Sequence, residues 1–237
     1  MLMSPQNLPV VLREVRARIA HAAAFAGRSA QSVTLLAVGK AQPLELLAAA
    51  ADCGVSDFGE SYLQEALQKI AALQERALTW HFIGRIQANK TRSIAESFAW
   101  VHAVDRLKIA ERLAAQRPFH APPLNVCLQV NVAAESTKGG VTPAELPALA
   151  AAVAQLPRLA LRGLMCIPPE ETEPARQRAW FARLRVLRDE LNRAGLSLDT
   201  LSMGMSGDFE AAIQEGATIV RLGTILFGAR PAVLANQ

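Results

Sequence analysis

The stretch VTLLAVGK (33–40) is an almost continuous apolar run, without the alternation expected of a strand that faces water on one side. Such a run is typical of a parallel strand that is covered on both faces. Further runs of strand character follow at intervals that leave room for a helix between neighbours. The eight expected strands span residues 33–40, 57–62, 79–84, 99–104, 124–132, 159–168, 200–206 and 218–228.

The segments between these runs follow helical periodicity and carry helix boundary signals. Pro43 begins a helix that runs to about Cys53, where Gly54 ends it. Apolar residues at helical spacing from Leu8 to Ile19 predict an opening helix, and we expect it to take the place of a helix missing after the eighth strand. The other helices are expected up to about Arg76, over 88–97, over 106–117 until Pro118, after Pro143, from about Pro174 to Arg193, and from near Asp208.

Strand and helix thus alternate along the whole chain, without a long linker or a break in composition. The chain has 237 residues, of which 51% are hydrophobic and 19% charged, so it can bury the core of one unit of this size. We expect one α/β domain over residues 1–237, a single (β/α)8 TIM-type barrel with an extra N-terminal helix. A doubly wound open sheet is the alternative, but this many units in this length favour closure.

The composition excludes several classes of protein and site. Its 25 basic and 21 acidic residues give a net charge of +4, too small an excess to indicate nucleic acid as a partner. No signal peptide pattern opens the chain, and no apolar stretch is long enough to span a membrane. The three cysteines, Cys53, Cys127 and Cys166, are expected to be reduced, and the histidines share no metal-ligand spacing. We expect a cytoplasmic monomer with no metal site, no membrane contact and no nucleic acid.

The active site of such a barrel lies at the C-terminal ends of its strands, and Lys40 stands directly after the first apolar run. Loss of hydration beside apolar walls would lower the pKa of this amine and favour imine formation with an aldehyde. The alternative is a solvated lysine at a strand end. Lys69 and Lys108 fall within expected helices and are interpreted as ordinary surface charges.

Three further polar residues lie in or near expected strand ends. His81, between two aromatic residues of the third run, is expected to be a hydrogen-bonded structural histidine. Glu60 could line the mouth of the barrel, whereas Glu65 is expected on a helix. None of these is assigned a catalytic role.

A candidate phosphate site follows the last two strands. The segment SMGMSGDFEAA (202–212) places glycines and serines, including Ser206, between a strand end and the start of a helix. Small residues there leave backbone N–H groups free to face an anion, and RLGT (221–224) again joins glycine to a hydroxyl. These two loops form the usual phosphate-binding corner of a (β/α)8 barrel.

Arg221 completes the constellation, because it stands inside an apolar strand and needs a partner there. A carboxylate in the core would be a structural partner, and a ring nitrogen acting as acceptor would be a functional one. A lysine, a phosphate site and a partner for a ring nitrogen together match the aldehyde, phosphate and pyridine nitrogen of pyridoxal 5′-phosphate (PLP).

The sequence also resembles a known family, the pyridoxal phosphate homeostasis proteins, whose fold is similar to the barrel domain of alanine racemase, the fold type III of PLP proteins. The resemblance covers nearly the whole chain in order. It is carried by VGK (38–40), FGESYLQE (58–65), WHFIGRIQANK (80–90), QVNVAAESTKGG (129–140), GLMCIP (163–168), LSMGMSGDFEAAI (201–213) and VRLGTILFG (220–228).

This resemblance implies a set of cofactor-binding residues. Lys40 would form a Schiff base with PLP, Ser206, Gly223 and Thr224 would contact its phosphate, and Arg221 would face the pyridine nitrogen. The full set implied is Lys40, Ser61, Met205, Ser206, Arg221, Gly223 and Thr224. The chain departs from the family at Gly39 and Ser61, where many members carry Ser and Asn.

The function implied is a PLP-binding protein that buffers or delivers the cofactor in vitamin B6 homeostasis, with PLP-dependent apo-enzymes as recipients and no robust catalysis. An amino-acid racemase is the alternative. It would need a second base, which alanine racemase takes from a second domain not expected here, so Tyr62, the single tyrosine, would have to serve. An aldolase using Lys40 would leave Arg221 unexplained. Lys138, in a Lys-Gly-Gly loop, is a candidate second acceptor of PLP.

Overall fold

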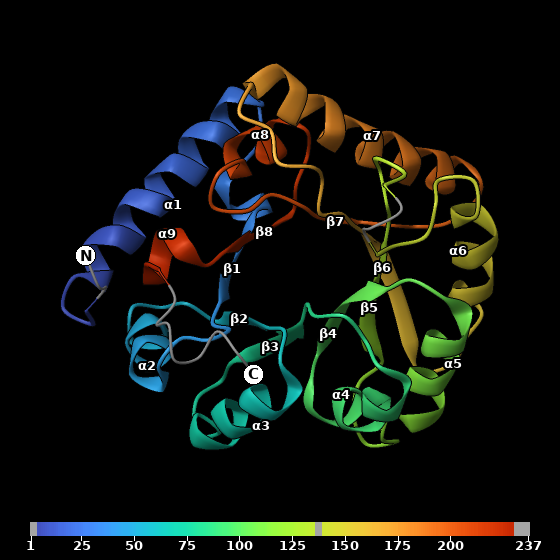
Figure 1. Cartoon of the computed structure of the whole chain (residues 1–237), viewed down its shortest axis with the longest axis horizontal. Coiled ribbons are helices and arrows are strands. Elements are labelled where there is room, and N and C mark those ends of the chain that lie inside the picture. Colours follow the sequence, from blue (N-terminus) through green and yellow to red (C-terminus); the bar gives the residue numbers. More distant parts are fainter. Residues whose placement is uncertain (1–3, 136–138, 230–237) are drawn as a thin grey trace.

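Eight parallel strands form a closed barrel in chain order in the computed structural model, which describes residues 4–135 and 139–229 (Figure 1). This arrangement confirms the expected (β/α)8 barrel and excludes the open sheet. The strands are β1 Thr34–Val38, β2 Asp57–Glu60, β3 Thr79–Phe82, β4 Trp100–Val104, β5 Leu124–Gln129, β6 Leu159–Met165, β7 Thr200–Ser202 and β8 Ile219–Leu222.

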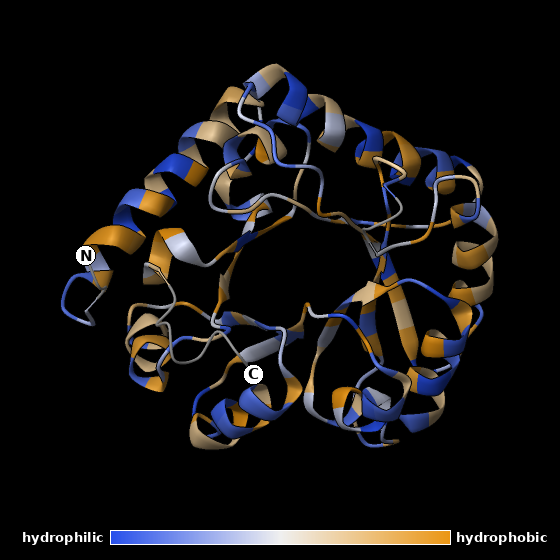
Figure 2. Cartoon of the chain, in the orientation of Figure 1, coloured by the Kyte–Doolittle hydropathy of each residue, from blue (hydrophilic) through white to orange (hydrophobic). Residues whose placement is uncertain are grey.

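Helices surround the barrel (Figure 1). Each helix carries both hydrophilic and hydrophobic residues (Figure 2), as expected of helices that cover a core with one face. The α-helices are α1 Leu8–Phe25, α2 Leu44–Asp52, α3 Leu63–Ala72, α4 Thr91–Ser97, α5 Leu107–Gln116, α6 Leu146–Ala154, α7 Pro174–Arg193, α8 Phe209–Gln214 and α9 Thr224–Phe227. Two short 3₁₀ helices span Ala30–Ser32 and Ala88–Lys90.

The opening helix α1 packs against α8, α9 and α2, so the first helix covers elements from both ends of the described chain. Its buried stripe includes Leu8, Leu12, Val15 and Ile19, which are the residues whose spacing predicted the helix. The amphipathic pattern was therefore a correct guide to the face that packs inward.

The prediction for the segment after β8 was wrong in one respect. The apolar run 218–228 was expected to be a strand throughout, but β8 ends at Leu222 and Thr224–Phe227 forms the short helix α9. A short helix therefore does follow the eighth strand, and α1 packs on it rather than replacing it. The reason is that a short apolar run cannot distinguish a buried strand from a buried helix, and Leu226 and Phe227 are fully buried in α9.

Most strands are shorter than the apolar runs that predicted them. Strands β1, β2 and β7 end two to four residues early, at Val38, Glu60 and Ser202. The residues beyond them form the loops at one end of the barrel, and Lys40 accordingly lies in a turn rather than in the strand itself. Helix α3 also ends at Ala72 rather than near Arg76.

In the described part of the chain, none of the helices has both the length and the apolarity that crossing a membrane requires. The cysteines Cys53, Cys127 and Cys166 form no disulfide, and the last two are buried. Among the described residues no group of three or more His, Cys, Asp or Glu could hold a metal ion.

Candidate functional site

The turn that carries Lys40 is held on both sides by helix α3. The carbonyl of Gly39 accepts a hydrogen bond from Nζ of Lys69 over 2.7 Å. The amide of Ala41 donates to Oε1 of Glu65, also over 2.7 Å. Ala41 adopts a left-handed conformation with φ +54°, which costs free energy for a residue other than glycine. The two hydrogen bonds offset that cost and fix the backbone from which the half-buried Lys40 side chain projects.

Lys69 corrects the expectation that it is an ordinary surface charge. It is buried, and its ammonium lies 2.9 Å from Oε1 of Glu60 and also pairs with Glu65. Its position on the buried stripe of α3 with Leu63 and Ala66 gives this orientation. A lysine can occupy such a stripe only because carboxylates from β2 and α3 meet it there.

Glu60 lies fully buried beneath the mouth rather than lining it. Its Oε2 has no hydrogen-bond partner among the described residues. Burial raises the pKa of Glu60 to about 7, although Lys69 and, more weakly, Lys40 act to lower it. Gly39 packs tightly here, since a Cβ at that position would lie 2.7 Å from Oε1 of Glu60. Lys40 therefore stands above a buried carboxylate that titrates near neutral pH.

The loops after β7 and β8 are joined by a hydrogen bond. The amide of Ile225 in α9 donates to Oγ of Ser206 over 3.2 Å. Gly204 has φ +94°, and a Cβ there would lie 2.6 Å from the Cβ of Ala212. Gly207 has open space where a Cβ would stand. Met205 and Thr224 are exposed beside this link, so the two loops present an accessible surface.

Arg221 points into the barrel and is almost fully buried. Its Nη1 donates to the carbonyl and the hydroxyl of Ser202, over 2.6 and 2.9 Å, and its Nη2 donates to the carbonyl of Cys166 over 2.8 Å. All three acceptors are neutral, so the carboxylate contact considered from the sequence is not the one observed. Burial lowers the pKa of Arg221, yet a guanidinium stays protonated under ordinary conditions.

Barrel closure brings these residues together. In the ladder between β1 and β8, Leu36 pairs with Arg221 and Ala37 with Leu222. A Cβ on Gly223 would accordingly lie 3.4 Å from the carbonyl of Val38, two residues before Lys40. The strand ends of β7, β8, β1 and β2 are contiguous in the barrel. They carry all seven residues expected at the site, with Ser61 directly after β2.

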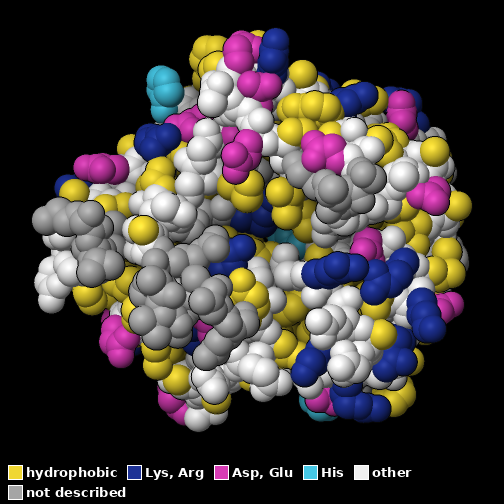
Figure 3. All heavy atoms as spheres, in the orientation of Figure 1, with side chains coloured by type: hydrophobic (Ala, Val, Ile, Leu, Met, Phe, Trp, Pro, Cys, Tyr) yellow, Lys and Arg dark blue, Asp and Glu magenta, His cyan; other side chains and the backbone are white. Residues whose placement is uncertain are grey.

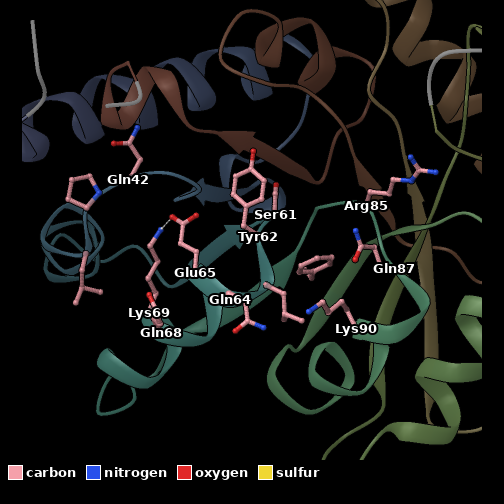
Figure 4. A pocket seen from close by; sticks show the side chains of 14 residues that line it. Gln42, Ser61, Tyr62, Gln64, Glu65, Gln68, Lys69, Arg85, Gln87 and Lys90 are labelled. Atoms are coloured by element: carbon pink, nitrogen blue, oxygen red, sulfur yellow. Dashed lines mark hydrogen bonds and ion pairs between the residues drawn. The ribbon is translucent and has the colours of Figure 1, made fainter. Parts of the chain in front are cut away.

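A cavity of about 650 Å³ lies beside this site, at the ends of β1, β2 and β3. Ser61 and Tyr62 line it together with Arg85 and Lys90, and Figure 4 shows the Glu65–Lys69 pair on its other side. Figure 3 shows basic and histidine side chains within a central hollow of the face seen there. Sequence reasoning missed Arg85 and Lys90, although both stand in the motif WHFIGRIQANK (80–90) that carried the resemblance.

His81 is buried and hydrogen-bonded to Asp57 and His102, which confirms its interpretation as a hydrogen-bonded core histidine. Lys108 is exposed, as expected. Lys138, the candidate second acceptor, lies outside the described residues.

Comparison with known proteins identifies relatives along nearly the whole chain. The family profile of the alanine racemase N-terminal domain matches residues 11–231. A pyridoxal phosphate homeostasis protein of Pseudomonas aeruginosa is 62% identical over 219 residues, which are 92% of this chain and 94% of that protein.

Solved structures agree. PipY of Synechococcus elongatus without PLP matches with a TM-score of 0.84 and 38% identity over 93% of this chain and all of that one. Its PLP-bound structure matches with a TM-score of 0.78 and 39% identity over 89% of this chain and all of that one. Alanine racemase of Corynebacterium glutamicum, 17% identical, matches in fold with a TM-score of 0.67 over 94% of this chain and 62% of its own. This chain therefore belongs to the pyridoxal phosphate homeostasis proteins, within the alanine racemase N-terminal domain family.

Proposed function

We propose that this chain binds PLP and buffers or delivers it in vitamin B6 homeostasis. The observation that carries the proposal is the convergence of a mouth lysine, a pair of linked hydroxyl-bearing loops and a buried arginine on contiguous strand ends. These groups match the aldehyde, phosphate and pyridine nitrogen of PLP. The PLP-bound structure of PipY supports the same ligand class.

The residues fit the cofactor in three places. Lys40 supplies the amine for a Schiff base, on a turn whose backbone is fixed by Glu65 and Lys69. Ser206, Gly223 and Thr224, with Met205 beside them, supply the phosphate site, and the open space at Gly207 leaves room there. Arg221 supplies the donor for the ring nitrogen, and Ser61 borders the site from β2.

The proposed role is that of a carrier rather than an enzyme. Bound PLP can act as an electron sink for amino-acid chemistry, but it does so best when its pyridine nitrogen is protonated. Arg221 keeps its own proton and donates only a hydrogen bond, which disfavours protonation of that nitrogen. Residual amino-acid racemase activity is the second candidate, because Tyr62 lines the cavity beside Ser61 and could serve as a base.

Several narrower features belong to the same proposal. We infer that residues 1–237 act as one PLP-binding barrel, as a monomer in the cytoplasm. PLP-dependent apo-enzymes would be the recipients. The accessible surface at Met205 and Thr224 supports this inference, since a carrier must release its cargo.

The deciding experiment is an absorbance titration of the purified protein with PLP, followed by borohydride reduction and peptide mapping. We expect a visible band that reduction removes and a label on the peptide of Lys40. Lys40→Ala should abolish the band, while Lys108→Ala, at an exposed helical site, should keep it. Labelling at Lys40, combined with an unreduced protein that transfers no PLP to an apo-enzyme and racemises amino acids, would favour the second candidate. Absence of any reducible band would overturn PLP binding through Lys40.

A further inference from the structure

A chain of hydrogen-bonded side chains crosses the interior of the barrel from Arg221. Nη1 of Arg221, on β8, donates to Oγ of Ser202, on β7, over 2.9 Å. The same oxygen lies 2.8 Å from Nδ1 of His102, on β4. Because β7 and β4 are not neighbours in the barrel, this second contact spans its interior.

The chain continues to the opposite end of the barrel. Nε2 of His102 lies 3.0 Å from Nδ1 of His81, and Nε2 of His81 lies 3.0 Å from Oδ1 of Asp57. Asp57 is the first residue of β2 and lines a second cavity, of about 460 Å³, where β1 and β2 begin. Its side chain is 21% exposed, whereas the other members of the chain are buried. A carboxylate in contact with solvent thus ends a path that starts at the arginine.

The carboxylate end fixes the order of donors and acceptors. Burial acts to raise the pKa of Asp57, but hydrogen bonds from His81 and Ser56 together with the electrostatic interaction with His81 outweigh it and lower that pKa. This carboxylate is therefore ionised at neutral pH and only accepts. Nε2 of His81 therefore carries a proton. Burial lowers the pKa of His81, and it lowers that of His102 further, so both rings are neutral.

Each neutral ring has one donor and one acceptor nitrogen. Nδ1 of His81 must accept, so Nε2 of His102 donates to it. Nδ1 of His102 must then accept from the hydroxyl of Ser202. That hydroxyl oxygen accepts in turn from Arg221. Every hydrogen bond in the chain consequently points from the guanidinium towards Asp57, and reversal would leave two acceptors, Nε2 of His81 and Oδ1 of Asp57, facing each other.

We infer that Ser202, His102 and His81 are positioning residues, which hold Arg221 as a permanent hydrogen-bond donor and connect its charge to Asp57 at the far end of the barrel. The ligand class that such a donor suits is a neutral aromatic ring with an acceptor nitrogen. This last step rests on the proposed function, whereas the order of the chain concerns the protein alone.

The order can be measured without cofactor, from the ¹⁵N resonances of the two imidazole rings in the full chain. We expect Nε2 to be protonated and Nδ1 to be unprotonated in both His81 and His102. A proton on Nδ1 of either ring would overturn the inferred order, because that ring would then donate in the opposite direction.

Ser202→Ala tests the link to Arg221. It removes the hydroxyl but keeps the two backbone carbonyls that also hold the guanidinium. Nδ1 of His102 then loses its donor, so its resonance should move downfield towards that of a free acceptor nitrogen, while Nε2 stays protonated. Thr200→Val is the matched control, a buried hydroxyl on the same strand that donates to Asp199 instead. An unchanged His102 resonance in Ser202→Ala would contradict the link.

The consequence for the ligand is tested by titration with PLP. We expect Ser202→Ala to bind PLP about fivefold more weakly, because one hydrogen bond that positions Arg221 is lost, and to shift the absorption maximum of the bound cofactor. Thr200→Val should match the wild type. If the wild type binds no PLP, the proposed function fails while the resonances still decide the order. Wild-type affinity and an unshifted spectrum in Ser202→Ala would overturn the positioning role alone.

Discussion

Lys69 is the residue whose environment is least like its sequence context. Its side chain joins the carbonyl before Lys40 to two carboxylates, of which Glu65 also binds the amide after Lys40. An ion pair at this depth gains little net free energy, because desolvation opposes the attraction, but losing one partner is costly. The pair is therefore better understood as a means of fixing the turn of Lys40 than as a source of stability.

Lys69→Met should destabilise the protein by about 3–5 kcal/mol, because two carboxylates lose their buried partner. The loss should be larger at pH 8 than at pH 5. Folding raises the pKa of Glu60 from 4.5 to about 7, so the folded state binds more protons between these values and loses stability as the pH rises through them. Removing the Lys69 ammonium raises the pKa of Glu60 further, so the stability of the variant falls more steeply than that of the wild type as the pH rises. Urea unfolding at both pH values measures this, with the exposed Lys108→Met as control. Equal losses at the two pH values would argue against an ionising Glu60.

Ser206→Ala should weaken PLP binding by about 1–2 kcal/mol, the value of one hydrogen bond to a charged group. The hydroxyl that would donate to phosphate is also the acceptor for the amide of Ile225, so its loss separates the two loops as well. Titration of the visible band gives the affinity. Ser32→Ala, a hydroxyl bonded locally on the surface, should leave it unchanged. Unaltered affinity in Ser206→Ala would place the phosphate elsewhere.

At the scale of elements, the connection from β7 to α8 requires a glycine at position 204 but not at position 207. Gly204 combines a left-handed backbone with close contact to α8, and its carbonyl accepts the amide hydrogen bond of Arg221. Gly207, three residues later, has open space for 4 Å around the place that a Cβ would take, and it carries no such backbone requirement. The loop is thus closely packed where it is hydrogen-bonded to β8 and uncrowded at Gly207.

Gly204→Ala should lower the free energy of unfolding by about 1–3 kcal/mol. The left-handed backbone is strained for any residue with a Cβ, and the added Cβ would also clash with the side chain of Ala212. Gly207→Ala in the same loop should stay within about 0.5 kcal/mol of the wild type. Thermal unfolding of the two variants provides the comparison. Similar stabilities for both would show that the loop relaxes around the added methyl group.

At the scale of the whole molecule, closure of the barrel makes distant parts of the chain neighbours. Strand β1 pairs with β8, which brings Lys40 beside the loop that follows Arg221. Helix α1 covers the same seam from outside, since it packs on α8 and α9. The site and the closure of the fold therefore depend on the same contacts between the two ends of the described chain.

Leu12→Ala should cost about 2–5 kcal/mol, the usual range for a buried leucine in a packed core. Leu12 is 1% exposed in the second turn of α1, whereas Val10, on the same helix, is 45% exposed. Val10→Ala should accordingly have little effect. Denaturant unfolding measures both, and PLP affinity should fall in Leu12→Ala if the seam supports the site. A small loss for Leu12→Ala would mean that α1 is peripheral to the barrel.

The sequence by itself determined the alternation of strands and helices and the closed barrel. It could do so because the period of apolar residues reports which face of an element is buried, and because eight such units in this length favour closure. The set of seven candidate site residues came from the resemblance to the homeostasis proteins, and it stays a prediction. The sequence did not predict helix α9, because buried apolar residues such as Leu226 and Phe227 are compatible with a strand as well as with a helix.

Only the tertiary structure decided which polar side chains meet. From the sequence alone Lys69 resembles a surface charge, and only the structure shows that it pairs with Glu60 of β2. Likewise, the sequence assigns His102 no role, and only the structure shows its contact with Ser202 across the barrel. These partners are 9 and 100 residues apart in the chain. Periodicity gives the direction in which a side chain points, but barrel closure and strand register determine what it contacts there, because they set the distances between residues that are remote in sequence.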